Sequence, residues 1–186
     1  MMDIVDLYLK HESFKTAVRL SGLPVHVAHV KLLQSGALKI QDKIQYGSKA
    51  AALGGEAEEL FHKLVPDAVD ANKYFQKNNP IYDFMFGNLT IDVKYSSLFK
   101  RKTGHSMNWQ INTKGDQDFI VAFLERERGA ELDSPYMLLL PMAFINVKKD
   151  LHISRSVAWF NDFQVEPEEL RSVLKDYSDL REAGHY

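Results

Sequence analysis

One short stretch constrains the fold most: residues 81–97 have the sequence IYDFMFGNLTIDVKYSS. Two apolar-rich runs flank a Gly-Asn dipeptide, which favours a two-residue hairpin turn. With this dipeptide as the loop, counting outward along both strands places Asp83 opposite Asp92. Side chains alternate between the faces of a strand, so Lys94 shares the face of both aspartates. The sequence therefore predicts a hairpin with two opposed carboxylates and a lysine on one face.

Opposed carboxylates have a specific chemical use. Like charges directly opposite each other destabilise a pair of strands, and a cation between them removes that repulsion. Hard divalent ions such as Mg²⁺ prefer carboxylate oxygens. The alternative is an amphipathic hairpin whose polar face is simply solvated. On the first interpretation, the hairpin is a metal site and its lysine could contact a phosphate.

A third carboxylate is expected from a helix over residues 47–65. On a helical wheel, its apolar stripe consists of Leu53, Ala57, Leu60, Phe61 and Leu64. Glu56 lies at the edge of this stripe, and Glu58 and Glu59 lie further round the wheel. We therefore expect Glu56 to point towards a sheet, and the other two glutamates to lie on the surface.

The rest of the chain suggests helices surrounding a mixed sheet. Strands are predicted over 118–125 and 136–142 and, from the run SVAWFNDFQV, over 156–165. Pro167 is expected to open a terminal helix. This pattern indicates an α/β or α+β core.

The motifs GGEAEELF, YDF and IDVK together resemble those of the PD-(D/E)XK nuclease superfamily, in its restriction-endonuclease and junction-resolvase members. In that superfamily, a helix bearing a glutamate packs beside a sheet whose strands carry Asp and (Asp/Glu)-X-Lys. The resemblance covers about residues 47–125, with Tyr82 where the motif has proline and Pro80 close by. It implies an α/β, restriction-endonuclease-like fold, with a mixed central sheet flanked by helices in a core of residues 47–186.

The resemblance also implies an activity and a site. The activity is metal-dependent hydrolysis of phosphodiester bonds by a DNA endonuclease, with Mg²⁺ as cofactor and Mn²⁺ as a substitute. The implied catalytic residues are Glu56, Asp83, Asp92 and Lys94, and the implied metal ligands are the three carboxylates with the backbone carbonyl of Val93. Gln110, in NWQIN, is a candidate accessory residue, and a structural amide is the alternative for it.

Residues 1–46 are predicted to form a small helical module. Two helices flank the turn SGL, and Ala17, Ser21, Val27 and Val30 follow the spacing of a helix-turn-helix. The second helix would then present His26, His29 and Lys31 to DNA. A following β-wing over 32–47 would make the module a winged helix. A plain helical hairpin packed on the core is the alternative.

A second basic segment is expected to contact DNA. Residues 94–114 contain five lysines and arginines and no acid, although the chain as a whole has a net charge of −2. We assign Lys100, Arg101 and Lys102 to DNA binding, and a solvated basic loop is the alternative.

Two other functions remain open: a Holliday-junction resolvase or repair nuclease on the same core, or a non-catalytic DNA-binding protein that uses residues 13–38. Duplex cleavage often needs two active sites, which makes a homodimer plausible. The chain has no cysteine, which excludes disulfides and thiolate zinc sites and favours an intracellular, cytoplasmic location. A polar N-terminus argues against a signal peptide, and no apolar run is long enough for a membrane helix.

Overall fold

The structure is a computed structural model that describes residues 3–11, 13–37, 49–74, 82–100, 106–145 and 149–185. It divides into two compact units, Met1–Gly55 and Glu56–Tyr186. The sequence suggested a division after residue 46, and the structural division falls inside α4 (Lys49–Leu64), which is one continuous helix. None of the helices in the described ranges is long and apolar enough to cross a membrane.

The first unit contains three short helices, α1 (Ile4–His11), α2 (Phe14–Ser21) and α3 (Val25–Gln34). Gly22 ends α2 in the left-handed conformation, with φ of 66°, so the turn predicted at SGL is present. The stripe of α3 that packs into the core consists of Ala28 and Leu32, four residues apart and fully buried. Val30, one of the residues with helix-turn-helix spacing, lies outside this stripe, because it is 51% exposed. Most of the predicted wing, residues 38–47, lies outside the described residues.

The main sheet of the second unit has five strands in the order β1-β2-β3-β6-β7. These are β1 (Val69–Asp70), β2 (Phe84–Phe86), β3 (Leu89–Ser96), β6 (Phe119–Leu124) and β7 (Tyr136–Pro141), with the short helix α5 (Ala71–Tyr74) after β1. Strands β3 and β6 are parallel, and the other neighbours are antiparallel. The predicted mixed central sheet is thus confirmed.

A second, smaller sheet is antiparallel and has the order β4-β5-β8. Its strands are β4 (Phe99–Lys100), β5 (Met107–Asn112) and β8 (Asp150–Ser154). The 3₁₀ turn η2 (Met142–Phe144) follows β7, and the helix α6 (Ala158–Asp162) follows β8. The sequence did not predict these three strands.

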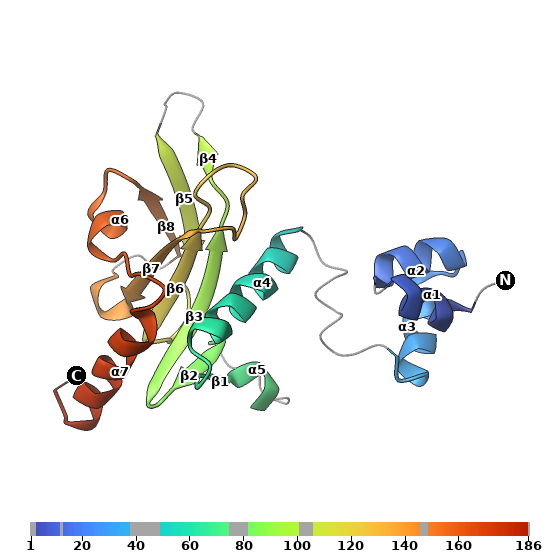
Figure 1. The fold of residues 1–186 in the computed structure, drawn as a ribbon, viewed down its shortest axis with the longest axis horizontal. Coiled ribbons are helices and arrows are strands. Elements are labelled where there is room, and N and C mark those ends of the chain that lie inside the picture. Colours follow the sequence, from blue (N-terminus) through green and yellow to red (C-terminus); the bar gives the residue numbers. More distant parts are fainter. Residues whose placement is uncertain are drawn as a thin grey trace. The chain divides into compact units, whose positions relative to one another are not determined.

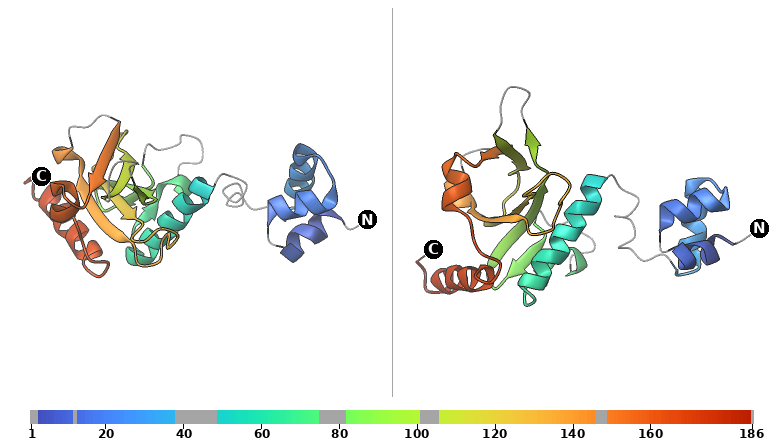
Figure 2. Two further views of the ribbon diagram at one scale, coloured as in Figure 1. Left: turned by 90° about the horizontal axis from the view of Figure 1, so that it is seen from above. Right: turned by 45° about the horizontal axis from the view of Figure 1, so that its top comes forward.

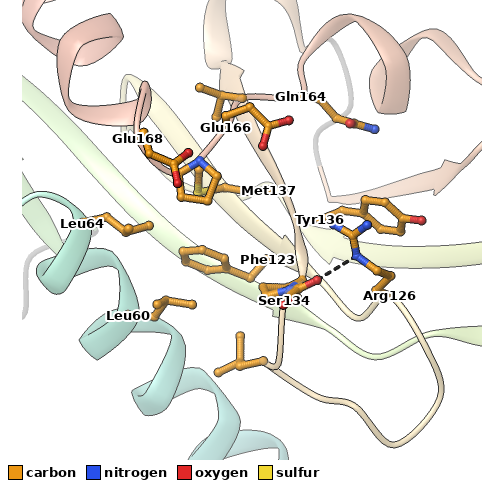
Figure 3. A pocket seen from close by; sticks show the side chains of 14 residues that line it. Leu60, Leu64, Phe123, Arg126, Ser134, Tyr136, Met137, Gln164, Glu166 and Glu168 are labelled. Atoms are coloured by element: carbon orange, nitrogen blue, oxygen red, sulfur yellow. Dashed lines mark hydrogen bonds between the residues drawn. The ribbon is translucent and has the colours of Figure 1, made fainter.

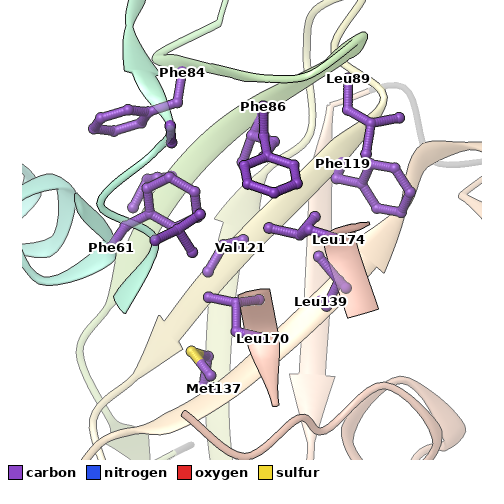
Figure 4. Close-up of a cluster of buried hydrophobic side chains, with 14 of the residues drawn as sticks. Phe61, Phe84, Phe86, Leu89, Phe119, Val121, Met137, Leu139, Leu170 and Leu174 are labelled. Atoms are coloured by element: carbon purple, nitrogen blue, oxygen red, sulfur yellow. The ribbon is translucent and has the colours of Figure 1, made fainter. Parts of the chain in front are cut away.

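Two apolar cores separate three layers (Figures 1 and 2). On one face of the main sheet, α4 and α7 (Leu170–Glu182) bury side chains such as Phe61 and Leu174 against Val121 (Figure 4). On the other face, the second sheet and α6 bury Trp109 and Phe160 against the even-numbered residues of β6 and β7. The main sheet is therefore covered on both sides, which explains why every residue of β6 is buried.

The hairpin register is the one predicted from the turn. Phe86 pairs with Leu89 and Phe84 pairs with Ile91, around a turn at Gly87 and Asn88. Gly87 has φ of 57°, as a type II′ hairpin turn requires at its first central position. Helix α7 supports this turn, because the carbonyl of Asn88 accepts a hydrogen bond from Arg181 at 2.9 Å.

The start of β3 is held in place by Asp118, which lies just before β6. Asp118 accepts hydrogen bonds from the backbone N–H of Thr90 at 2.8 Å and from the Arg181 guanidinium at 2.7 and 2.8 Å. Burial pushes the pKa of Asp118 upward, but the hydrogen bonds from Arg181 and Thr90 outweigh burial and hold it below its usual range. The start of β3 is thus tied to both β6 and α7.

Two predictions about the last quarter of the chain have different outcomes. The strand expected over 156–165 is wrong, because these residues contain α6. Trp159 and Phe163, four residues apart, stack at 5.5 Å, and this is the spacing of neighbours on a helix. The terminal helix is present as α7, and it begins three residues after Pro167.

Replacing Gly87 by alanine is expected to lower the free energy of unfolding by at least about 2 kcal/mol, measured by urea denaturation. The added methyl group would be in a left-handed conformation and would collide with the hydroxyl of Ser178 on α7. Gly184→Ala is the matched control, because Gly184 also has a positive φ but open space around it. The control should cost about 1 kcal/mol. Equal losses for the two variants would show that the contact with α7 does not matter.

Candidate active site

Asp83 is held at the entrance to the hairpin by three hydrogen bonds. Its backbone N–H donates to the carbonyl of Ile91 at 3.0 Å, and its backbone carbonyl accepts from the N–H of Ala71 at 2.9 Å. Its side-chain Oδ2 accepts from the N–H of Val93 at 2.8 Å. The carboxylate therefore occupies a place in the ladder beside β3, where it faces Asp92.

Asp92 and Lys94 lie on the face of the main sheet that the second sheet covers. Their partners on β6 are Ile120 and Ala122, which belong to the core beneath the second sheet. Asp92 is only 4% exposed, and its Oδ2 lies 2.7 Å from Nζ of Lys94. The structure thus brings the two aspartates and the lysine together, with Asp92 and Lys94 on one face of β3 and Asp83 beside that strand.

The environment of Asp92 favours its protonated form. The pKa of Asp92 is raised to about 7 in total: burial is the largest cause, hydrogen bonding with Asp83 adds to the increase, and Lys94 opposes it. The two carboxylates are therefore close enough to share a proton. This is the expected behaviour of like charges that cannot both ionise without a cation between them.

The helix acid that approaches this pair is Glu58, and the expectation that Glu56 points towards the sheet is wrong. Glu56 is exposed, whereas Glu58 is half-buried. The pKa of Glu58 is raised to about 7 in total: burial is the largest cause, and the nearby charges of Asp83 and Asp70 contribute to the increase. Glu58 is therefore close enough to the hairpin carboxylates for their negative charges to raise its pKa. It is the site residue that the sequence analysis missed.

The helical wheel explains this error. Glu56 and Glu58 flank Ala57 on opposite sides, each about 100° from it. Leu60 and Leu64 shift the predicted stripe towards Glu56, but both are only partly buried. The fully buried residues Phe61 and Val65 shift it towards Glu58 instead. The positions of Phe61 and Val65 on the wheel favour Glu58. To choose it from the sequence, one would have to know that Leu60 and Leu64 are only partly buried.

The donor set fits a divalent cation in its chemistry. The carboxylates of Glu58, Asp83 and Asp92 and the backbone carbonyl of Val93 are oxygen donors of the kind that Mg²⁺ prefers. Within the described ranges, no three His, Asp or Glu side chains are already arranged around a common metal position. A cation would therefore displace protons from the carboxylates and draw the side chains inward.

The other predicted site residues lie elsewhere. Gln110 is exposed on β5, and its backbone N–H donates to the Ser96 hydroxyl at 3.0 Å. His26 and Lys31 are exposed on α3, whereas His29 is partly buried, with its ring 5.8 Å from that of Phe14. The side chain of Lys100 and the whole of Arg101 and Lys102 lie outside the described residues.

A pocket of about 370 Å³ lies beside α4, next to the segment that follows β6 (Figure 3). Its lining includes Leu60 and Phe123, and none of the site carboxylates belongs to it. Arg126 lies over the ring of Tyr136 at 4.2 Å and donates to the carbonyl of Ser134 at 2.8 Å, which orders one wall. The pocket is thus separate from the candidate active site.

Comparison with known proteins adds one likeness. No protein-family model matches the chain, and no curated protein matches it. Among solved structures, the chain is similar to a bacterial homing endonuclease, I-Ssp6803I, with 17% sequence identity and a TM-score of 0.48. The match covers 74% of this chain and 99% of the other. At this identity a likeness concerns the fold alone, and the chemistry must come from the site itself.

Proposed function

We propose that this chain is a metal-dependent DNA endonuclease of the PD-(D/E)XK type, with its active site at the hairpin. One observation carries the proposal: Asp83 and Asp92 approach each other, Lys94 contacts Asp92 at 2.7 Å, and Glu58 approaches from α4. A solvated hairpin would not need a buried carboxylate in this position. The site uses Glu58 in place of the Glu56 that the sequence suggested.

The side chains have distinct roles in this proposal. A bound Mg²⁺ or Mn²⁺ would neutralise charge on the scissile phosphate and lower the pKa of the attacking water. Asp92 and Asp83 would hold the cation, with the position of Asp83 fixed by the N–H of Val93. Lys94, kept in place by Asp92, would orient the water and stabilise the charge that develops on the phosphate.

Metal affinity is expected to increase with pH. The pKa values of Asp92 and Glu58 are raised to about 7, so protons compete with the cation below this value and are lost above it. The dissociation constant for Mg²⁺ should therefore fall by at least about tenfold between pH 6 and pH 8. Isothermal titration calorimetry at the two pH values measures this change. Affinity that does not vary with pH would show that the cation binds other groups.

The function is tested by incubating the full chain with supercoiled plasmid and with a four-way DNA junction, in Mg²⁺ and in EDTA. The proposal predicts cleavage of the plasmid that requires Mg²⁺. Cleavage of the junction alone would identify a resolvase on the same core. Binding of DNA without any cleavage, at several Mg²⁺ and Mn²⁺ concentrations, would contradict the nuclease and favour a DNA-binding protein.

A further inference from the structure

The second sheet has an outer face that no function described so far uses. On β5 and β8, the odd-numbered residues such as Trp109 and Ile153 are buried against the main sheet. The alternate residues Gln110, Asn112 and His152 are exposed on the other face. We call these three residues the outer face. All three carry planar polar groups that can donate and accept hydrogen bonds.

The hydrogen-bonding capacity of the outer face is largely unused. Within the described residues, the side chains of Gln110 and His152 make no hydrogen bond or ion pair, and the two residues are directly opposite each other. Asn112 accepts the N–H of Lys114 at 2.9 Å through Oδ1, which leaves its NH₂ group available. Asn108, on the same side of β5, differs because its NH₂ group donates to the carbonyl of Ser106 at 2.7 Å.

The strand that carries Gln110 lies beside the strand that carries Lys94. The backbone N–H of Gln110 donates to the hydroxyl of Ser96 at 3.0 Å. Ser96 is on β3, two residues after Lys94 and on the same face of the strand. The backbone of β5 at Gln110 is therefore next to the end of β3 that follows Lys94, within the span of one bound duplex.

The charge around the outer face suits a polyanion. Residues 98–115, which include β4 and β5, contain four lysines and arginines and no acid. Lys114 and Lys149 are exposed at the end of the sheet where Asn112 lies. Asp150, opposite Asn112, is the single acid in the β5–β8 pair and lies at that same end. The residues around the outer face thus have a net positive charge, and the outer face itself is neutral and able to form hydrogen bonds.

We propose that the outer face reads base edges in the major groove of the duplex DNA that the hairpin cuts, an inference that rests on the proposed function. The major groove admits a two-stranded β-ribbon, and Gln and Asn side chains there form paired hydrogen bonds with adenine. Alternate residues of a strand are about 6.8 Å apart, the rise of about two base pairs. Gln110 and Asn112 therefore match base pairs two steps apart, with His152 beside the first.

The test is selection from a pool of randomised duplex DNA by the full chain, with Ca²⁺ in place of Mg²⁺ so that binding is measured apart from cleavage. The wild type, Gln110→Ala, Asn112→Ala and His152→Ala are compared with Asn72→Ala, which removes an exposed amide on α5. The wild type and the control should select the same sequence. Gln110→Ala and Asn112→Ala should each lose about tenfold or more of the discrimination at a different position, two base pairs apart.

The outcomes separate this inference from the proposed function. Unchanged preferences in all three variants, or a wild type that binds duplex DNA with no sequence preference, would overturn the outer face as a reading surface. Mg²⁺-dependent plasmid cleavage by the same wild-type preparation would leave the nuclease intact in either case. A chain that neither binds nor cleaves duplex DNA would overturn both. Thermal melts of the variants establish that each is folded.

Discussion

Replacing Asp92 by asparagine is expected to reduce Mg²⁺-dependent DNA cleavage about 1000-fold or more. The variant keeps the shape of the side chain but removes the charge that holds the cation and Lys94. Initial rates of plasmid nicking, with Mg²⁺ at saturation, measure the effect. Saturating metal ensures that the loss reflects the reaction rather than a weaker affinity for the cation.

The control for this variant is Asp116→Asn, because Asp116 is an exposed aspartate in the same unit. It should cleave DNA at the wild-type rate. The Asp92 variant should remain folded: a pKa raised to about 7 means that ionised Asp92 costs stability above that pH, and an amide avoids this cost. Its free energy of unfolding at pH 8, without metal, should equal or exceed that of the wild type. Full cleavage by folded Asp92→Asn would contradict the site.

Glu58→Gln is expected to lower the cleavage rate about 100-fold, while Glu56→Gln changes it less than about twofold. The two glutamates are two residues apart on α4, so the variants share composition and helix context. They differ in their surroundings, because the pKa of Glu58 responds to Asp83 and Asp70 and Glu56 is exposed. Plasmid nicking rates and calorimetric Mg²⁺ affinities should both separate the two variants.

The reverse order of effects would restore Glu56 as the helix acid. It would require α4 to rotate when metal or DNA binds, since Glu56 and Glu58 lie on opposite sides of Ala57. No effect of either variant would show that the two aspartates hold the cation without a helix acid. The pair of variants therefore decides whether Glu58, Glu56 or neither glutamate is the third carboxylate of the site.

The hairpin could be predicted from the sequence because its geometry is local. A Gly-Asn turn fixes the register of β2 on β3, and this register brings Asp83, just before β2, beside Asp92 and Lys94 on β3. The strands β6 and β7 could be predicted for a similar reason, since each is a continuous apolar run. These features depend on few residues outside the segment itself.

Features that depend on packing between distant segments could not be predicted in the same way. The rotation of α4 about its axis depends on which of its apolar side chains pack on the sheet. The sequence analysis counted Leu60 and Leu64 as core residues, and it therefore predicted Glu56 instead of Glu58 as the helix acid. The aromatic residues of 156–165 are compatible with a strand, and contacts with Trp109 place Phe160 on a helix instead. The second sheet pairs β5 with β8, about 40 residues away along the chain.

The most direct measurement is the position of a divalent cation in crystals of the full chain grown with Mn²⁺, located by its anomalous scattering. The account predicts one strong peak between the carboxylates of Asp83 and Asp92, within about 2.5 Å of an oxygen of each and close to the carbonyl of Val93. The peak should be absent in the Asp92→Asn variant. Mn²⁺ bound elsewhere, with Lys94 still paired to Asp92 in a protein that cleaves DNA, would contradict the account.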